Sequence, residues 1–280
     1  MRTKLFILLF PMKSTLITLI FLITSSSICD AQSCNLPERL ENRIETFCSL
    51  DSIEPEAYFK VSGDLFLYGY KNEELNLSKC KVYNYVDSKL FYSNDTLERL
   101  FAYQLIYVAG DTSYNEQLNE RLNSVNPILN KSFIANILMQ TNDRKYFSSI
   151  FDFLVSLKDG PIKNMYISNL SQEDHTAFKS ICWENIDSDN IDRQIIAIRC
   201  LAQYNPDKKF QGKMTTKFST WDDEHKKYLI QAMLFQKMVL KPYLIKYRNN
   251  PVIGHVVLKA LKLSNHEEDN AYAKDLESDN

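Results

Sequence analysis

Residues 192–202, DRQIIAIRCLA, carry the helical pattern from which our prediction of the fold begins. Ile195, Ile198 and Leu201 recur every three residues, and charged residues lie in the same stretch, which predicts an amphipathic helix over residues 191–204. The small residue Ala197 lies among them, at a position where a second helix can approach closely. The stretch therefore predicts a short helix that packs tightly against a neighbouring helix.

Similar short runs of helical pattern follow one another from Asn94 onward. They cover residues 97–108, 131–140, 144–157, 162–170, 174–185, 207–218, 222–237, 242–247 and 251–263. Their apolar centres align at Ala102, Ala135, Tyr166, Ala197, Leu229 and Val257, with intervals of 33, 31, 31, 32 and 28 residues. A period near 30 residues with two helices in each unit is typical of a helical solenoid.

On these residues, and on residues 192–202 above all, the chain resembles the HEAT/armadillo-like superfamily of α-solenoid repeats. The resemblance covers roughly residues 95–264 and implies stacked helix pairs, because one pair cannot bury its apolar face alone. The units are shorter than the roughly 40 residues usual in that superfamily. The alternative is an irregular all-α domain. We expect residues 94–264 to form an all-α solenoid.

The flanking segments differ in composition from this central region. Residues 32–93 are rich in aromatic side chains, and residues 37–48 have the pattern of one helix. Residues 54–92 fit either a helix or a hairpin of two strands around Ser62-Gly63-Asp64, and we favour the helix because the rest of the chain is helical. Residues 265–280 carry six acids and one lysine, so we expect an acidic disordered tail.

The first residues have the pattern of a cleaved signal peptide over residues 1–31. Basic residues precede the apolar run LITLIFLIT at residues 16–24, and Cys29-Asp30-Ala31 has the small residues of a cleavage site. Met12 is an alternative start. A membrane anchor, or lipid attachment at Cys29 or Cys34, is the alternative to cleavage. We expect an exported protein, secreted or periplasmic, with no transmembrane span after the signal is removed.

Export to an oxidising compartment permits disulfide bonds. Five cysteines follow the predicted cleavage site, and this odd number leaves at least one thiol without a partner in the same chain. The shortest plausible loops are Cys34–Cys48 and Cys182–Cys200. Burial of all five as apolar residues is the alternative.

Composition and motifs exclude several classes of function. Six glycines in 280 residues are few for loops that wrap around phosphates, and a net charge of −2 does not suit a general nucleic-acid binder. The sequence has no metal-binding pattern of histidines or cysteines; we interpret Asp222-Asp223-Glu224-His225 as the charged start of a helix. We therefore expect no metal, no cofactor and no nucleic acid.

Basic residues are concentrated in one part of the predicted solenoid. Residues 206–248 contain ten basic side chains against four acidic ones, and stacked helices can align such lysines along one ridge. An ordinary solvated face is the alternative. From the second helix of each pair, we expect the following contact residues for a partner with an acidic surface: Lys213, Lys217, Lys237, Lys241 and Tyr243.

The sequence thus predicts an exported, non-enzymatic helical-repeat protein that binds another protein. Such a protein would act as a scaffold, in assembly of the cell envelope, or as an inhibitor of the immunity type. The alternative from another class is a secreted hydrolase whose active site has no sequence motif. A cleft that unites distant Asp or Glu side chains with raised pKa values would favour the hydrolase.

Overall fold

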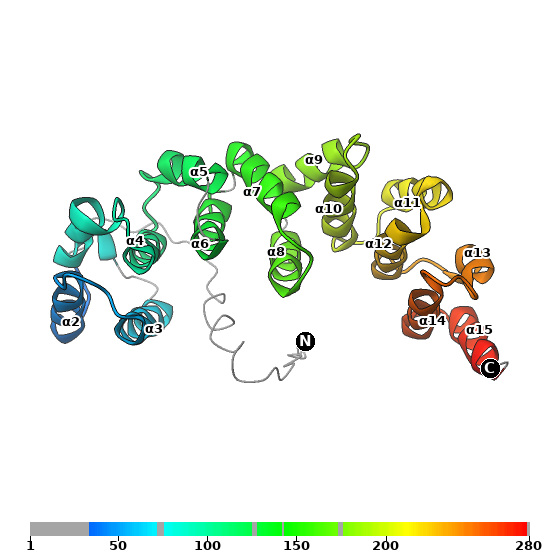
Figure 1. Ribbon diagram of the computed structural model, residues 1–280, viewed down its shortest axis with the longest axis horizontal. Coiled ribbons are helices and arrows are strands. Elements are labelled where there is room, and N and C mark those ends of the chain that lie inside the picture. Colours follow the sequence, from blue (N-terminus) through cyan, green and yellow to red (C-terminus); the bar gives the residue numbers. More distant parts are fainter. Residues whose placement is uncertain (1–33, 72–75, 125–127, 142, 173–175, 279–280) are drawn as a thin grey trace. The chain divides into compact units, whose positions relative to one another are not determined.

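The computed structural model describes residues 34–71, 76–124, 128–141, 143–172 and 176–278. Its described residues are helical, and they contain no strand (Figure 1). The all-α helical-repeat fold is therefore confirmed. The described residues form two compact units, divided between Ile137 and Leu138, whereas the sequence suggested a boundary between residues 93 and 94. The predicted signal peptide, with Cys29, lies outside the described residues.

The first unit begins with two long helices and a stretch of short turns. Helices α2 (Glu38–Cys48) and α3 (Pro55–Lys71) pack against each other. Three short helical turns then follow, η1 (Leu77–Lys79), η2 (Lys81–Asn84) and the π turn η3 (Val86–Leu90). The helix predicted over residues 37–48 is confirmed. Residues 58–68 lie within α3, so the hairpin alternative is wrong.

Helix α4 (Thr96–Ala109) forms the core of the first unit and packs against α3 and η3. Asp95 caps its start by accepting hydrogen bonds from the backbone N–H groups of Leu97 and Glu98, and Gly110 ends it with a left-handed φ of 63°. Both signals are visible in the sequence. The buried Phe101 ring lies 4.8 Å from that of Phe47, between centroids. Helices α5 (Asn115–Asn123) and α6 (Ile128–Met139) follow.

The second unit is a stack of helix pairs. Its helices are α7 (Arg144–Ser156), α8 (Pro161–Gln172), α9 (Thr176–Asn185), α10 (Ile191–Ala202), α11 (Lys208–Thr220), α12 (Asp223–Phe235), α13 (Lys241–Leu244), η4 (Ile245–Tyr247), α14 (Gly254–Leu263) and α15 (Glu267–Ser278). Helices α8, α10, α12 and α14 form one row in which each helix packs on the next. Helices α7, α9 and α11 lie together along one side of this row (Figure 1). Among the described residues, none of the helices combines the length and the apolar character needed to cross a bilayer.

Helix α10, which contains residues 192–202, has neighbours on several sides. It packs against α8 and α12 in its own row and against α7 and α9. Its apolar side chains from Ile195 to Ile198 are buried, and Ala197 is fully enclosed.

Gln236, which directly follows α12, is fully buried and contacts the turn after α10. Its Nε2 donates to the carbonyl oxygens of Ala202 (3.1 Å) and Tyr204 (3.0 Å), and its Oε1 accepts from the backbone N–H of Asp207 (2.9 Å).

The expected disordered tail is wrong, because residues 267–278 form helix α15. The physical reason is one residue, Asp269, whose side chain is completely buried. Its carboxylate accepts hydrogen bonds from the backbone N–H groups of Leu240 (3.0 Å) and Lys241 (2.7 Å) and from Ser264 Oγ (2.6 Å). It thereby satisfies the amides at the start of α13 and fixes α15 against α13 and α14.

The disulfide of the described residues joins Cys34 to Cys80, so the expected Cys34–Cys48 pair is wrong. Cys48 lies on the buried face of α2, and burial raises the pKa of its thiol to about 12. Cys182 and Cys200 are both buried and reduced, so the second expected pair is not formed, although α9 and α10 bring them together. Burial and a hydrogen bond with Cys200 raise the pKa of Cys182.

We expect Asp269→Asn to lower the free energy of unfolding of the second unit by about 2–3 kcal/mol, because a buried charged acceptor is lost and an amide N–H₂ replaces it. Both tryptophans, Trp183 and Trp221, belong to this unit, so tryptophan fluorescence during urea unfolding measures it selectively. The neighbouring, exposed Glu268→Gln is the control. An unchanged midpoint for Asp269→Asn would show that α15 does not depend on this carboxylate.

We expect differential alkylation to find Cys34 and Cys80 protected until reduction. Cys48, Cys182 and Cys200 should react only after denaturation, because all three are buried. Replacing both Cys34 and Cys80 by Ser should cost about 2–4 kcal/mol, since the bond closes a long loop in the unfolded chain. Peptide mapping that found Cys48 bonded to Cys34 would contradict this pairing.

Candidate functional site

The five predicted contact residues lie in two places in the second unit. Lys213 and Lys217 lie one turn apart on α11, whereas Lys237 follows α12, and Lys241 and Tyr243 belong to α13. Only the first two meet, at the carboxylate of Asp187. The Lys241 ammonium lies 5.4 Å from the centroid of the Tyr272 ring, and the hydroxyl groups of Tyr243 and Thr215 are 3.5 Å apart.

Asp187 follows helix α9 and receives both lysines. Lys213 Nζ donates to Asp187 Oδ2, and Lys217 Nζ lies 3.2 Å from Asp187 Oδ1. Lys217 is also 2.6 Å from Gln194 Oε1 and is almost fully buried. The hydrogen bond from Lys213 lowers the pKa of Asp187, so the carboxylate is ionised at neutral pH. Since Lys213 and Asp187 are both largely exposed, their ion pair contributes about 0–1 kcal/mol.

Lys209 is a third lysine on the same face, and the sequence analysis did not select it. It lies one turn before Lys213, and its ammonium is 4.7 Å from the centroid of the half-buried Trp183 ring. The Trp183 ring meets the buried Phe210 edge to face, with centroids 6.1 Å apart. We call Lys209, Lys213 and Lys217 the α11 lysine row. The spacing of four residues is visible in the sequence, but the tryptophan and the carboxylate beside the row come from α9 and the turn after it.

The α11 lysine row has more cations than carboxylates. Among the described residues, Asp187 is the single acid that forms ion pairs with the row. Lys213 and Lys217 share one carboxylate, and no carboxylate contact is seen for Lys209 in the described part of the chain. The resulting excess of positive charge beside an aromatic ring attracts anionic groups. The α11 lysine row is therefore the candidate binding surface of the second unit.

The basic region outside the row contains one buried lysine, Lys226, and several exposed basic residues. Lys226 is buried, pairs with Asp223 at 2.8 Å, and lies 5.0 Å from the centroid of the Tyr247 ring. Burial alone lowers the pKa of Lys226, but its hydrogen bonds to Asp223 and Tyr247 raise it overall. The exposed basic residues outside the row are Lys208, Lys227, Lys237, Lys246 and Arg248.

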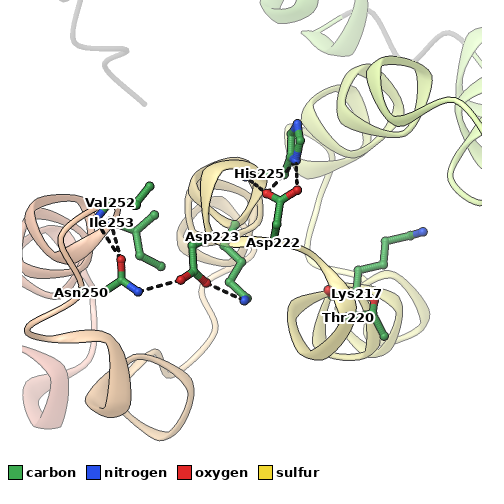
Figure 2. Close-up of polar contacts among 9 residues, drawn as sticks. Lys217, Thr220, Asp222, Asp223, His225, Asn250, Val252 and Ile253 are labelled. Carbon is green, nitrogen blue, oxygen red and sulfur yellow. Dashed lines mark hydrogen bonds and ion pairs between the residues drawn. The ribbon is translucent and has the colours of Figure 1, made fainter.

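The acidic run at the start of α12 is a capped helix start, as predicted, and the carboxylates of Asp222 and Asp223 diverge (Figure 2). Asp222 accepts a backbone hydrogen bond from His225 at 3.0 Å, and its carboxylate oxygens are 2.8 Å from His225 Nδ1. Asp223 points to the opposite side, where Lys226 and Asn250 Nδ2 (2.7 Å) contact it. The two adjacent acids therefore serve separate contacts and do not converge on one ion.

One group of metal-type donors occurs in the described part of the chain. The side-chain donor atoms of Cys34, Glu41 and Cys80 lie within 4.8 Å of one another. The two sulfur atoms are joined as a disulfide, and Glu41 Oε1 accepts the backbone N–H of Lys81 at 2.9 Å. A disulfide sulfur is not a thiolate ligand. The group is therefore a disulfide beside a carboxylate.

A second polar cluster connects three helices of the row through Asp159, which precedes α8. Asp159 Oδ1 is 3.0 Å from Arg199 Nη1 of α10 and 3.3 Å from Lys163 Nζ of α8. Tyr228 of α12 donates its hydroxyl to Asp159 Oδ2 at 2.6 Å. Partial burial raises the pKa of Asp159, but the hydrogen bond from Tyr228 and the charge of Arg199 lower it overall. Burial and the bond to Asp159 raise the pKa of Tyr228 to about 12.

The hydrolase alternative gains no support from the acids. Every described carboxyl group with a resolved shift has a lowered pKa; these groups are Asp111, Asp159, Glu184, Asp187, Asp222 and Asp223. A general acid at neutral pH requires a raised value.

Comparison with known proteins gives no relative: the chain matches no protein-family model, no curated protein and no solved structure.

We expect the Asp159 cluster to make the second unit sensitive to acid. The folded-state pKa of Asp159 lies below its ordinary 3.8, so the unfolded chain takes up this proton at a higher pH than the folded chain. The stabilisation is complete above pH 4–5 and is lost as the pH falls through 3.8 toward the folded value. Asp159→Asn should lower the urea midpoint at pH 7 and flatten its decline between about pH 4.5 and 2.5.

Tryptophan fluorescence during urea unfolding checks this expectation over the same pH range. Glu224→Gln, an exposed acid on α12, is the control and should leave the slope nearly unchanged. Parallel pH profiles for the wild type and Asp159→Asn would remove Asp159 from the explanation.

Proposed function

We propose that this chain is an exported, non-enzymatic helical-repeat protein that binds an acidic surface of another protein through the α11 lysine row. The observation that carries the proposal is the excess of lysines over carboxylates beside the half-buried Trp183. Export rests on the signal-like residues 1–31, and the assignment to HEAT/armadillo-like repeats rests on the period near 30 residues. Scaffolding, envelope assembly and inhibition of the immunity type are the roles that fit such binding.

The physical chemistry of the row favours binding over catalysis. Tryptophan is enriched among the residues that dominate binding energy, because a half-buried ring offers a large, rigid contact area. Lys209 and Lys213 add an electrostatic attraction that accelerates encounter with an acidic partner. Because both ammonium groups lie at the surface, salt should weaken the interaction by screening.

Affinity capture with variants tests the proposal. The full-length chain, tagged at its C-terminus, is exposed to the envelope and secreted fractions of its native host, and retained proteins are quantified by mass spectrometry. We expect a stoichiometric partner that elutes with salt and is lost at least tenfold with the double variant Lys209→Glu/Lys213→Glu. The reversal of two charges on one face accounts for this loss.

The matched control is Lys227→Glu/Lys246→Glu, which makes the same change in net charge at two exposed lysines outside the row. It should change capture by less than twofold, and circular dichroism should confirm that both double variants remain helical. Equal losses in the two double variants would mean that net charge, and not the α11 lysine row, attracts the partner.

A further inference from the structure

Asp187 has an unusual position in the α11 lysine row, because it is the single acid that the row contacts among the described residues. We propose that Asp187 occupies, in the free protein, the place that a carboxylate of the partner takes in the complex. This inference rests on the proposed function and adds a regulatory role: Asp187 is a built-in competitor for the partner. The partner then presents an acidic peptide segment to the row.

The two lysines that Asp187 contacts are held differently. Lys217 is only 11% exposed and has a second acceptor, Gln194 Oε1 at 2.6 Å, so it keeps its position without Asp187. Lys213 is 41% exposed, and its carboxylate contact in the described part of the chain is Asp187, itself 55% exposed. An exposed ion pair of this kind contributes little to stability. Replacing Asp187 at Lys213 by another carboxylate therefore costs little free energy.

Lys209 provides the second attachment point. Its ammonium lies over the Trp183 ring, and no carboxylate contacts it among the described residues. The backbone positions of Lys209 and Lys213 differ by four residues on one helix, which is a rise of about 6 Å. Two carboxylates that are close together in a partner can therefore bind the two lysines, one on each.

An extended acidic peptide is the class of ligand that we assign to two lysines on one face. In an extended chain, residues i and i+2 lie on the same side and about 6.6 Å apart. A segment with acids at alternate positions thus presents two carboxylates to the row, one of which replaces Asp187 at Lys213. The Trp183 ring lies beside Lys209, where it can contact the methylene groups of the bound segment.

Fluorescence anisotropy with a fluorescein-labelled hexaglutamate peptide tests the inference, and a hexaglutamine peptide is the neutral control. The critical comparison is between Asp187→Asn and Glu184→Gln in the full chain. Both variants remove one exposed negative charge at the C-terminal end of α9, and both acids are ion-paired. Glu184 pairs with Arg144 of α7, however, and not with the row. Loss of a competitor should strengthen peptide binding about five- to tenfold in Asp187→Asn and less than twofold in Glu184→Gln.

The outcomes separate the inference from the proposed function. Equal strengthening by the two variants overturns the competitor role, because the change in net charge alone would explain it. Weaker binding by Asp187→Asn also overturns it, because Asp187 would then keep the row in order and not compete with the peptide. If the affinity for hexaglutamate is unchanged in Lys209→Glu/Lys213→Glu, or if no variant binds the peptide, the row is not the binding surface. Binding that requires both lysines and is strengthened specifically by Asp187→Asn supports both.

Discussion

Short helices that cannot bury their own apolar side chains impose the main constraint on the second unit. Helix α10 has buried residues around most of its circumference, and these need α7, α8, α9 and α12 as neighbours. Because α12 in turn requires α14, the row grows by addition of similar elements. The polar contacts follow from this arrangement. Asp159 connects α8, α10 and α12 at one edge, and Gln236 satisfies the backbone of the turn after α10.

The acids of helix α15 have different surroundings. Among the described residues of this helix, Asp269 is buried, and the other acids lie on an exposed face. The acids of residues 267–278 therefore have two roles, and only the buried Asp269 determines where the helix docks.

The sequence predicts the local structure well and the long-range contacts poorly. The cap at Asp95 and the stop at Gly110 depend on nearby residues and can be recognised in the sequence, and the predicted helix over residues 37–48 is confirmed. The tail prediction is wrong because average composition does not reveal that one acid, Asp269, faces unsatisfied amides. The partner of Cys34 depends on the chain path after α3, which no local pattern encodes. For the lysines, periodicity indicates a shared face but not the residues opposite, so the burial of Lys217 and Lys226 is visible only in the structure.

The burial of Cys48 has a consequence for how long the native pairing lasts. In the folded chain Cys48 is fully buried, and burial raises the pKa of its thiol to about 12. Since the attacking species in disulfide exchange is the thiolate, this thiol is nearly inert at neutral pH. The fold thus protects the Cys34–Cys80 disulfide from rearrangement by the cysteine that lies nearest to Cys34 in the sequence.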